Sequence, residues 1–329
     1  MTVLVTGAAG FIGMHVAAQL LERGERVLGV DNLSDYYDVG LKKARLAHLG
    51  GRPEFRFVRG DIAEAGDLEA ALGEVPDVDR IVHLAAQAGV RYSLTNPAAY
   101  ARANLTGHFN LLELARELGD GLGHFVYASS SSVYGGNTKH PFSVDDRVDR
   151  PISLYAATKR ADEVMSYAYS HMFGLPMTGL RFFSVYGSWG RPDMSAYIFT
   201  SKILADEPIP VFNHGDMSRD FTYIDDVVAG VLAALDRPPA ASDATGGAPH
   251  ALYNLGNERL EPLPRLIAII EDTLGKKARV EYLPMQPGDV QSTIADIGSS
   301  RRDLGYDPRT TIDEGIPRFI AWYRDYHGV

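Results

Sequence analysis

The stretch Val3-Leu-Val-Thr6-Gly7-Ala-Ala-Gly10-Phe-Ile-Gly13, close to the start of the chain, decides the fold class. Its apolar opening, Val3–Thr6, predicts a short buried strand, and the amphipathic stretch Phe11–Arg23 predicts a helix. The glycines allow a tight turn, the close approach of a pyrophosphate and the packing of the helix on the strand. The amino end of such a helix turns its amides and positive dipole end toward phosphates. We therefore predict a dinucleotide-binding turn here, although the same glycines can also form a tight turn that binds nothing.

The alternation of apolar runs with amphipathic stretches continues through the first half of the chain. The expected strands are Val3–Thr6, Arg26–Val30, Phe55–Val58, Arg80–Leu84, His124–Ala128 and Met177–Phe182. The expected helices are Phe11–Arg23, Leu41–Leu49, Leu68–Leu72, Pro97–Leu118 and Ser153–Phe173. Strands that alternate with helices predict a parallel sheet with helices on both faces, so we expect an α/β fold of the doubly wound, Rossmann type.

The pattern weakens after about residue 184, where Pro and Gly become frequent. The later expected elements are helices at Ala196–Ala205, Leu263–Leu274 and Ile312–Tyr326 and short strands at Pro210–Phe212 and Phe221–Ile224. We therefore expect a dinucleotide-binding domain over residues 1–183 and a smaller C-terminal α/β domain for the substrate over residues 184–329. A segment at about 222–255 is expected to return to the first domain.

Composition limits the classes of function. The chain has 32 Lys and Arg against 42 Asp and Glu, a formal net charge of −10, which argues against a nucleic-acid binder that relies on a broad basic face. The absence of Cys excludes disulfides, thiol nucleophiles and thiolate metal sites, and we expect no metal centre. No apolar run reaches the roughly 18 residues of a membrane span, and the chain opens without a leader pattern. We therefore expect a cytoplasmic protein with no membrane partner.

Carboxylates and small residues follow the other expected strands, where a dinucleotide would lie. Asp31 ends the second strand, 18 residues after Gly13, where a carboxylate would bind the adenosine ribose and repel a 2′-phosphate. This favours NAD over NADP, and a loop-capping role for Asp31 is the alternative. Asp61 and Ile62 would flank the adenine, and the run Leu84–Gln87 would let backbone pass close to the cofactor. The expected cofactor-binding residues are Gly7, Gly10, Phe11, Ile12, Gly13, Asp31, Asn32, Asp61, Ile62, Leu84, Ala85, Ala86, Gln87, Ser129, Tyr155, Lys159 and Phe183.

Tyr155 and Lys159 lie four residues apart, so a helix would place the phenol and the ammonium on one face. They follow a Ser-rich turn at the end of the fifth expected strand, and ligands bind at the carboxyl ends of strands in a doubly wound sheet. A tyrosine that acts as a base must lose a proton whose ordinary pKa is about 10, and a nearby ammonium and an oxidised nicotinamide would both favour the phenolate. Ser130 can hydrogen-bond the same substrate hydroxyl. We expect Tyr155, Lys159 and Ser130 to be catalytic, and the alternative is a surface Tyr–Lys pair on an amphipathic helix.

Several separate segments carry a family resemblance that covers essentially the whole chain. The motif Thr6–Gly13, the Ser-rich turn ending in Val133-Tyr134-Gly135, and the Tyr155–Lys159 pair resemble the extended short-chain dehydrogenase/reductase superfamily. The segments that resemble UDP-glucuronate 4-epimerases in particular are Asn32-Leu-Ser-Asp-Tyr-Tyr-Asp38, Leu180-Arg-Phe-Phe-Ser-Val-Tyr-Gly187, Trp189-Gly-Arg-Pro-Asp-Met194 and Met285-Gln-Pro-Gly-Asp-Val290.

The resemblance implies NAD⁺ as a tightly held cofactor and a UDP-uronic acid as substrate. Tyr155 would take the proton of the C4 hydroxyl while hydride leaves C4 for NAD⁺, and hydride would return to the other face of the 4-keto sugar. Because a C4 ketone beside a C5 carboxylate makes a β-keto acid that readily loses CO₂, an epimerase must hold the carboxylate out of alignment with the ketone. Arg191 can form a bidentate clamp on that carboxylate. The substrate-binding residues would be Ser131, Ser132, Ser184 and Arg191 at the carboxylate, Val211 and Phe212 at the uracil, Arg219 at the diphosphate and Asp289 at a ribose hydroxyl.

Ser188 and Ser195 stand where this family usually has Pro and Ala, so the geometry of the loop around Arg191 is open. The alternative role for Arg191 is a surface salt bridge. The resemblance also suggests a homodimer through the stretches Pro97–Leu118 and Ser153–Phe173, whose apolar content permits it.

Related enzymes differ at the Ser-rich turn. Sugar 4,6-dehydratases typically carry an Asp–Glu pair at the positions of Ser131 and Ser132, and UDP-glucuronate decarboxylases typically carry Glu at the position of Ser132. UDP-glucose 4-epimerase needs the same Ser, Tyr and Lys but has no substrate carboxylate to bind, so the segment around Arg191 argues against it. A protein that senses NAD without catalysis is the alternative from another class. The expected activity is NAD-dependent epimerisation of UDP-glucuronate to UDP-galacturonate without decarboxylation.

Overall fold

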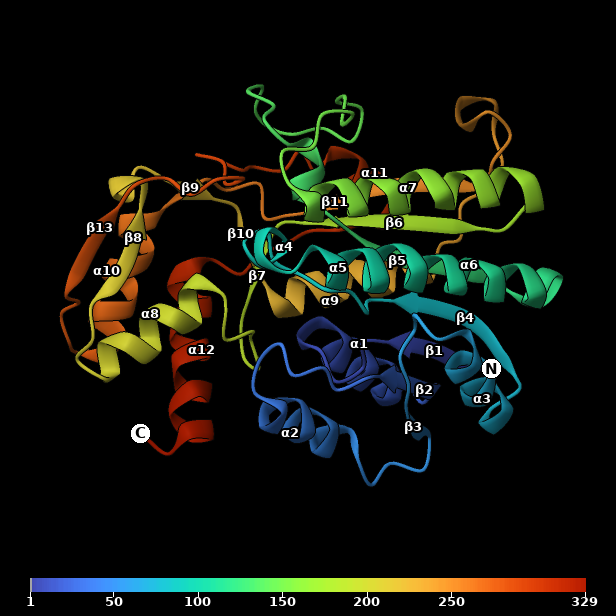
Figure 1. Ribbon diagram of the computed structural model, residues 1–329, viewed down its shortest axis with the longest axis horizontal. Coiled ribbons are helices and arrows are strands. Elements are labelled where there is room, and N and C mark those ends of the chain that lie inside the picture. The colour runs from blue at the N-terminus through green and yellow to red at the C-terminus, as the bar shows by residue number, and fades with distance from the viewer. Residues whose placement is uncertain (1) are drawn as a thin grey trace.

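A parallel sheet lies at the centre of the molecule. In the computed structural model, which describes residues 2–329, the spatial order of its seven strands is β11 (His250–Leu255), β6 (Met177–Phe182), β5 (His124–Ser130), β4 (Val78–His83), β1 (Thr2–Thr6), β2 (Arg26–Asp31) and β3 (Phe55–Arg59) (Figure 1). The chain builds the sheet outward from β1 to one edge, then returns to β4 and builds toward the other edge, which is the doubly wound order. The predicted fold class is confirmed.

Helices cover both faces of this sheet. One face carries α1 (Phe11–Glu22), α2 (Val39–Leu49) and α9 (Ile224–Leu235), and the other carries α3 (Ala65–Glu74), α6 (Gly107–Leu118) and α7 (Leu154–Phe173). Alternation along β1 supplies both layers, because Val3 and Val5 belong to one buried cluster and Leu4 to the other. No helix within residues 2–329 is both long enough and apolar enough to cross a membrane.

The stretch expected as one helix over Pro97–Leu118 is interrupted. It consists of α5 (Pro97–Tyr100), a wider π-helical turn at Ala101–Thr106, and α6. Within the turn, the buried side chain of Asn104 accepts from the backbone amide of Gln87 at 2.8 Å and donates to its carbonyl at 3.1 Å. These bonds tie the turn to the loop after β4, and π-helical turns of this kind are frequent at functional sites.

A smaller lobe, at left in Figure 1, packs beside the sheet. Its elements are α8 (Ser195–Leu204), β8 (Ile209–Phe212), α10 (Leu263–Leu274), β13 (Val280–Leu283), which pairs with β8, and α12 (Ile312–His327). The remaining short elements are α4 (Tyr92–Thr95), β7 (Ser184–Tyr186), β9 (Ser218–Arg219), β10 (Phe221–Tyr223), β12 (Glu261–Pro262) and α11 (Gly298–Leu304).

Two elements that the sequence analysis does not include, α9 and β11, lie within residues 222–255. α9 packs against α1 and β5, and β11 pairs with β6 at the edge of the sheet. Apolar residues at Val227, Val228, Val231 and Leu232 have the spacing of a buried helix face, so a signal for α9 is present in the sequence. The division into domains at residues 1–183 and 184–329 stays a prediction.

Candidate active site

The turn between β1 and α1 depends on its glycines. Gly7 has a φ of +73°, and a Cβ there would lie 2.8 Å from the amide nitrogen of Ala85. A Cβ on Gly13 would lie 2.0 Å from the carbonyl oxygen of Gly7. α1 can therefore begin directly against β1, and no side chain within residues 2–329 caps its amino end. An uncapped helix start at the carboxyl edge of a sheet suits a phosphate group.

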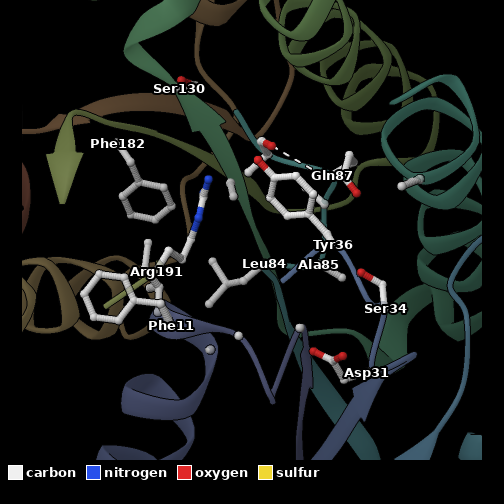
Figure 2. Close-up of a pocket in the computed structure, with 18 of the residues that line it drawn as sticks. Phe11, Asp31, Ser34, Tyr36, Leu84, Ala85, Gln87, Ser130, Phe182 and Arg191 are labelled. Atoms are coloured by element: carbon white, nitrogen blue, oxygen red, sulfur yellow. Dashed lines mark hydrogen bonds between the residues drawn. The ribbon is translucent and has the colours of Figure 1, made fainter. Parts of the chain in front are cut away.

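A cavity opens at this edge, and every residue of the expected cofactor set lies on its wall. Figure 2 shows Asp31 at one end and Ser130 at the other, with Arg191 between them in that view. A dinucleotide therefore fits the residues present. The further wall residues that sequence reasoning missed are Ser34, Tyr36, Tyr37, Lys42, Gly60, Ala88, Ala103, Ala128, Phe182, Val185 and Met194. The first three belong to the Asn32–Asp38 segment of the family resemblance, which marks the loop but not the side chains that face the cavity.

Asp31 holds the glycine turn as well as lining the cavity. It is 7% exposed, its Oδ2 accepts from the amide of Ala9 at 3.2 Å, and its Oδ1 accepts from the amide of Leu33 at 2.8 Å. The ammonium of Lys42 lies 3.9 Å from Oδ1. The loop-capping role weighed as the alternative is therefore real. It coexists with a place on the cavity wall, because a carboxylate has more acceptor sites than these two amides use.

α7 positions Tyr155 and Lys159. Ser153 caps the helix by accepting a hydrogen bond from a first-turn amide at 3.1 Å, which places Tyr155 in the first turn. Lys159 is 3% exposed, and its ammonium donates to the carbonyl of Ala128 and to Oδ2 of Asp162, each at 3.0 Å. Both Tyr155 and Lys159 lie on the cavity wall, so an exposed Tyr–Lys pair does not describe them.

Asp162 is a buried acid that sequence reasoning missed. It has no exposed surface, and its second oxygen, Oδ1, has no hydrogen-bond partner within residues 2–329. Burial raises the pKa of Asp162 to about 6, and the Lys159 ammonium acts against that shift. The only signal in the sequence is the three-residue spacing from Lys159, which many surface pairs share. Asp162 offsets part of the charge of Lys159 beneath the cavity.

Ser129 and Ser130 of the Ser-rich turn both lie on the cavity wall, and the Ser129 hydroxyl donates to Glu163 at 2.6 Å. Oγ of Ser130 accepts from the amide of Ser132 at 3.2 Å and from its hydroxyl at 2.9 Å. These two accepted bonds leave the proton of Ser130 available for donation. Ser131 and Ser132 lie on the wall of neither this cavity nor the second one described below, because the chain enters a 3₁₀ turn at Ser131–Tyr134 directly after β5. The geometry therefore does not support their expected place at the substrate carboxylate, and Ser132 supports Ser130 instead.

Arg191 lies on the wall of this cavity and of the second, adjoining one. Its Nε and Nη2 donate to the two carboxylate oxygens of Asp193 at 3.0 and 2.5 Å, and the hydroxyl of Tyr36 donates to Asp193 at 3.2 Å. Burial lowers the pKa of Arg191 and the Asp193 charge raises it, with a net rise, so the guanidinium stays charged. Arg191 does form a salt bridge, as the alternative role required. This salt bridge lies in a cavity wall rather than on the outer surface, and the Arg191 side chain is 22% exposed.

The second cavity has a volume of about 480 Å³. The expected substrate residues on its wall are Ser184, Arg191, Phe212, Arg219 and Asp289. Nη2 of Arg219 donates to Asp289 at 2.7 Å. The guanidinium of Arg91, which sequence reasoning missed, lies 4.2 Å from the centroid of the Phe212 ring and adds a second cation to this wall.

Val211 does not join Phe212 on that wall. Alternation along β8 turns Ile209 and Val211 into the core, where Val211 is 2% exposed, and turns Pro210 and Phe212 toward the cavity. The structure therefore does not place the Val211 side chain on this wall, and the expected contact of Val211 with the uracil stays a prediction. Within residues 2–329, no three His, Cys, Asp or Glu side chains form a group that could hold a metal ion.

Comparison with known proteins shows the family of this chain. The family model described as "NAD dependent epimerase/dehydratase family" matches residues 3–256. The chain belongs to this family. NAD as the cofactor is thereby confirmed at the level of the family.

The relatives of this NAD-dependent epimerase/dehydratase match it over nearly its whole length. "UDP-glucuronate 4-epimerase 3" of Arabidopsis thaliana is 48% identical over 334 residues, which cover 99% of this chain and 77% of that protein. "Protein CapI" of Staphylococcus aureus is 45% identical over 337 residues, which cover 99% of each chain. A crystal structure of UDP-glucuronic acid 4-epimerase from Bacillus cereus, in complex with UDP-glucuronic acid and NAD, is 33% identical with a TM-score of 0.90 and covers 99% of this chain and 100% of that one. The resemblance to UDP-glucuronate 4-epimerases is confirmed.

Proposed function

We propose that this protein inverts C4 of UDP-glucuronate to give UDP-galacturonate, through a transient 4-keto sugar and without loss of CO₂. The observation that carries the proposal is the position of Arg191 on the wall of both cavities. One cavity carries Tyr155 and the other carries Arg219, so a nucleotide sugar that spans them would meet the base and a carboxylate-binding arginine together. UDP-glucuronate has such a carboxylate at C5, and relatives with the name of that epimerase cover the whole chain.

The proton steps belong to Tyr155 and Ser130. Tyr155 accepts the proton of the C4 hydroxyl, and Lys159 lies one turn further along the same face of α7. Ser130 donates to the same sugar oxygen, because both bonds from Ser132 leave its proton free. When bound, NAD⁺ supplies the hydride acceptor for C4 and the hydride that returns to the opposite face. Tyr155 then gives its proton back to the new hydroxyl.

Arg191 controls the side reaction. The 4-keto sugar is a β-keto acid, which loses CO₂ when its bond to the carboxylate lines up with the ketone π system. Asp193 holds Nε and Nη2 of Arg191, which directs Nη1 to donate to a substrate carboxylate. The Ser184 hydroxyl lies on the wall of the same second cavity and can add a donor. A carboxylate held by both groups cannot rotate into the orientation that decarboxylation requires.

The nucleotide would occupy the second cavity. Asp289 lies 2.7 Å from Arg219 and 3.8 Å from Arg91, so one carboxylate holds two cations in position for a diphosphate. Phe212 offers its ring to the uracil, and Asp289 can bond a ribose hydroxyl. Elimination or decarboxylation would instead call for a carboxyl group at Ser131 or Ser132, where this chain has only hydroxyls.

We also propose that two copies associate through α6 and α7. Phe109 on α6 is 45% exposed, and Val164 and Tyr167 on α7 are 51% and 41% exposed. The two helices pack against each other, so both can contribute exposed apolar side chains to one interface. Exposed apolar side chains that gather in one region are typical of a protein interface.

The proposed function is tested by Arg191→Ala, with Arg147→Ala as a matched control. Arg147 is exposed and pairs with Asp149 two residues on, the same sequence arrangement as Arg191 and Asp193 but away from both cavities. Loss of a charge-assisted hydrogen bond should weaken UDP-glucuronate binding by about 1.5–3 kcal/mol. We also expect part of the 4-keto sugar to lose CO₂, which leaves a UDP-4-keto-pentose and NADH on the enzyme.

Mass spectrometry of the reaction mixture and the absorbance of bound NADH measure both effects. Arg191→Lys should be intermediate, because it keeps the charge and loses the fork geometry. If Arg191→Ala makes the 4-epimer at normal affinity with no CO₂ released, the carboxylate is held elsewhere and the proposal loses its main support.

A further inference from the structure

Arg45, on the helix α2, donates hydrogen bonds to the backbone of the loop that carries Arg191. Arg45 lies on α2 and has no exposed surface. None of the ion pairs formed within residues 2–329 involves it, although a buried charge without a carboxylate partner is costly. Such a charge persists only where its donors are well satisfied.

All five N–H donors of the Arg45 guanidinium have an acceptor. Nε at 3.2 Å and Nη2 at 2.6 Å both donate to the carbonyl of Trp189, and Nη2 also donates to the carbonyl of Gly190 at 3.2 Å. Nη1 donates to the carbonyl of Ala9 at 3.1 Å and to the hydroxyl of Tyr37 at 2.6 Å. Every acceptor is neutral, so Arg45 stabilises the loops that supply these acceptors and does not neutralise a carboxylate.

The backbone acceptors belong to two loops that are far apart in the sequence and meet at Arg45. Ala9 lies in the glycine turn, and its amide is bound to Asp31 at 3.2 Å. Trp189 and Gly190 directly precede Arg191, and Trp189 has a φ of +63°, which is unfavourable for a residue with a bulky side chain. Three N–H bonds to these two carbonyls hold the loop in this conformation, which sets where the Arg191 side chain leaves the backbone.

Other contacts fix the outer part of the same loop. His15 on α1 donates from Nε2 to the carbonyl of Ser188 at 3.0 Å, and burial lowers the pKa of His15 to about 4, so this donor is neutral. The Trp189 ring lies 5.3 Å from the ring of Trp322 and 5.3 Å from that of Tyr326, both on α12. These contacts hold the ring of Trp189, whereas Arg45 holds the carbonyls nearest to Arg191.

We propose that Arg45 is a positioning residue for Arg191, which fixes the place of its guanidinium and so sets the preference for sugars that carry a carboxylate. Arg45 lies on the wall of neither cavity, so it acts through the loop. This role rests on the proposed function, because it needs a substrate carboxylate at Arg191.

The test compares two ligands that differ only in the carboxylate, UDP-glucuronate and UDP-glucose. Their affinities are measured by calorimetry on NAD⁺-loaded protein that carries Tyr155→Phe, which prevents turnover. Adding Arg45→Met should reduce the preference for UDP-glucuronate by about tenfold, the size of one misplaced charge-assisted hydrogen bond, and change the affinity for UDP-glucose by less than about twofold. Arg52→Met is the control, because Arg52, like Arg45, donates to a backbone carbonyl, in this case that of Ala18 in α1 at 3.3 Å, away from this loop.

A double-mutant cycle with Arg191→Ala separates positioning from general support. If Arg45 acts through Arg191, Arg45→Met has no further effect on the preference once Arg191 is Ala. The positioning role is overturned if Arg45→Met weakens the binding of UDP-glucuronate and UDP-glucose equally. It is also overturned if Arg45→Met reduces the preference for UDP-glucuronate by the same factor when Arg191 is already Ala. Arg45→Lys, which keeps the charge and cannot reach all the acceptors, is judged by the same criteria if Arg45→Met does not fold. A parent protein without any preference for UDP-glucuronate would overturn the proposed function itself, and this role with it.

Discussion

Tyr155→Phe removes one hydroxyl and leaves the wall of the site in place. Because general-base catalysis contributes about 10²–10⁴-fold, we expect at least a 100-fold loss of kcat with NAD and UDP-glucuronate still bound. Steady-state rates and calorimetry measure the two effects. Tyr100→Phe is the control, since the Tyr100 ring lies edge-on at 6.0 Å from that of Tyr155. If Tyr155→Phe keeps more than about a tenth of the rate, another group is the base.

Asp31→Asn tests whether the Asp31 carboxylate makes the protein prefer NAD over NADP. It keeps the shape of the side chain but removes the charge that repels a 2′-phosphate, while the Lys42 ammonium remains close by, 3.9 Å from Oδ1 in the unmodified chain. We expect weaker NAD binding, stronger NADP binding and a change of about tenfold in their ratio, measured by cofactor exchange. Adding Lys42→Met should reverse the gain for NADP. An unchanged ratio of NAD to NADP affinity would show that some other group distinguishes the ribose hydroxyl from the 2′-phosphate.

The residues of the motifs could be predicted individually, because the spacing of a glycine turn or of a Tyr–Lys pair is visible in the sequence. Asp162 was not, because its importance lies in its burial, and Arg45 and Arg91 were not, because their partners come from distant segments. Val211 shows a different limit. The sequence places it beside Phe212, but only the register of β8 decides which of the two faces the cavity.

At the scale of elements, the inner strands such as β1 and β5 follow the pattern of apolar runs, since strands buried on both faces read as continuous apolar stretches. The edge strand β3 is only partly buried, and its apolar residues alternate with arginines instead. The π-helical turn inside Pro97–Leu118 has no such signature, because it depends on the bonds between Asn104 and Gln87. β11 was also outside the prediction, because His250–Leu255 mixes polar and apolar residues and gains its place from pairing with β6.

The pairing of two copies through α6 and α7 is tested by placing charges on those helices. Phe109→Glu combined with Val164→Glu should convert a dimer to a monomer in sedimentation velocity, because burying two unpaired carboxylates outweighs a modest apolar interface. Leu260→Glu, at a position that is 45% exposed outside these helices, is the control and should leave the dimer intact. A dimer that persists in the double variant would place the interface on another surface.

At the scale of the whole molecule, buried histidines make the fold sensitive to acid. Burial lowers the pKa of His124 to about 4 and that of His83 to about 3. A group with a depressed folded pKa stabilises the fold above its unfolded value of about 6.5, and this contribution is lost as pH falls toward the folded value. Burial raises the pKa of Asp162 and of Asp220 to about 6, so these acids oppose the trend between about pH 4 and 6.

His124→Gln isolates one of these groups. Nδ1 of His124 donates to the carbonyl of Leu235 at 3.0 Å, Nε2 lies 2.9 Å from the hydroxyl oxygen of Thr178, and burial of the ring favours its neutral form. We expect the variant to lose less stability than the wild type between pH 6.5 and about 4, whatever its stability at pH 8. Denaturant unfolding at a series of pH values measures the slopes, with the exposed His48→Gln as control. Equal slopes for His124→Gln and the wild type would show that His124 does not contribute.

The central claim, inversion at C4 through a 4-keto sugar whose carboxylate is held, is tested most directly by following the C4 hydrogen. UDP-glucuronate with deuterium at C4 is incubated with the wild-type protein and NAD⁺ in ordinary water, and the products are separated and examined by mass spectrometry and NMR. We expect UDP-galacturonate that retains deuterium at C4, with no UDP-pentose and no CO₂. Release of a UDP-pentose, a 4-epimer that carries ordinary hydrogen at C4, or the absence of any 4-epimer would contradict this claim.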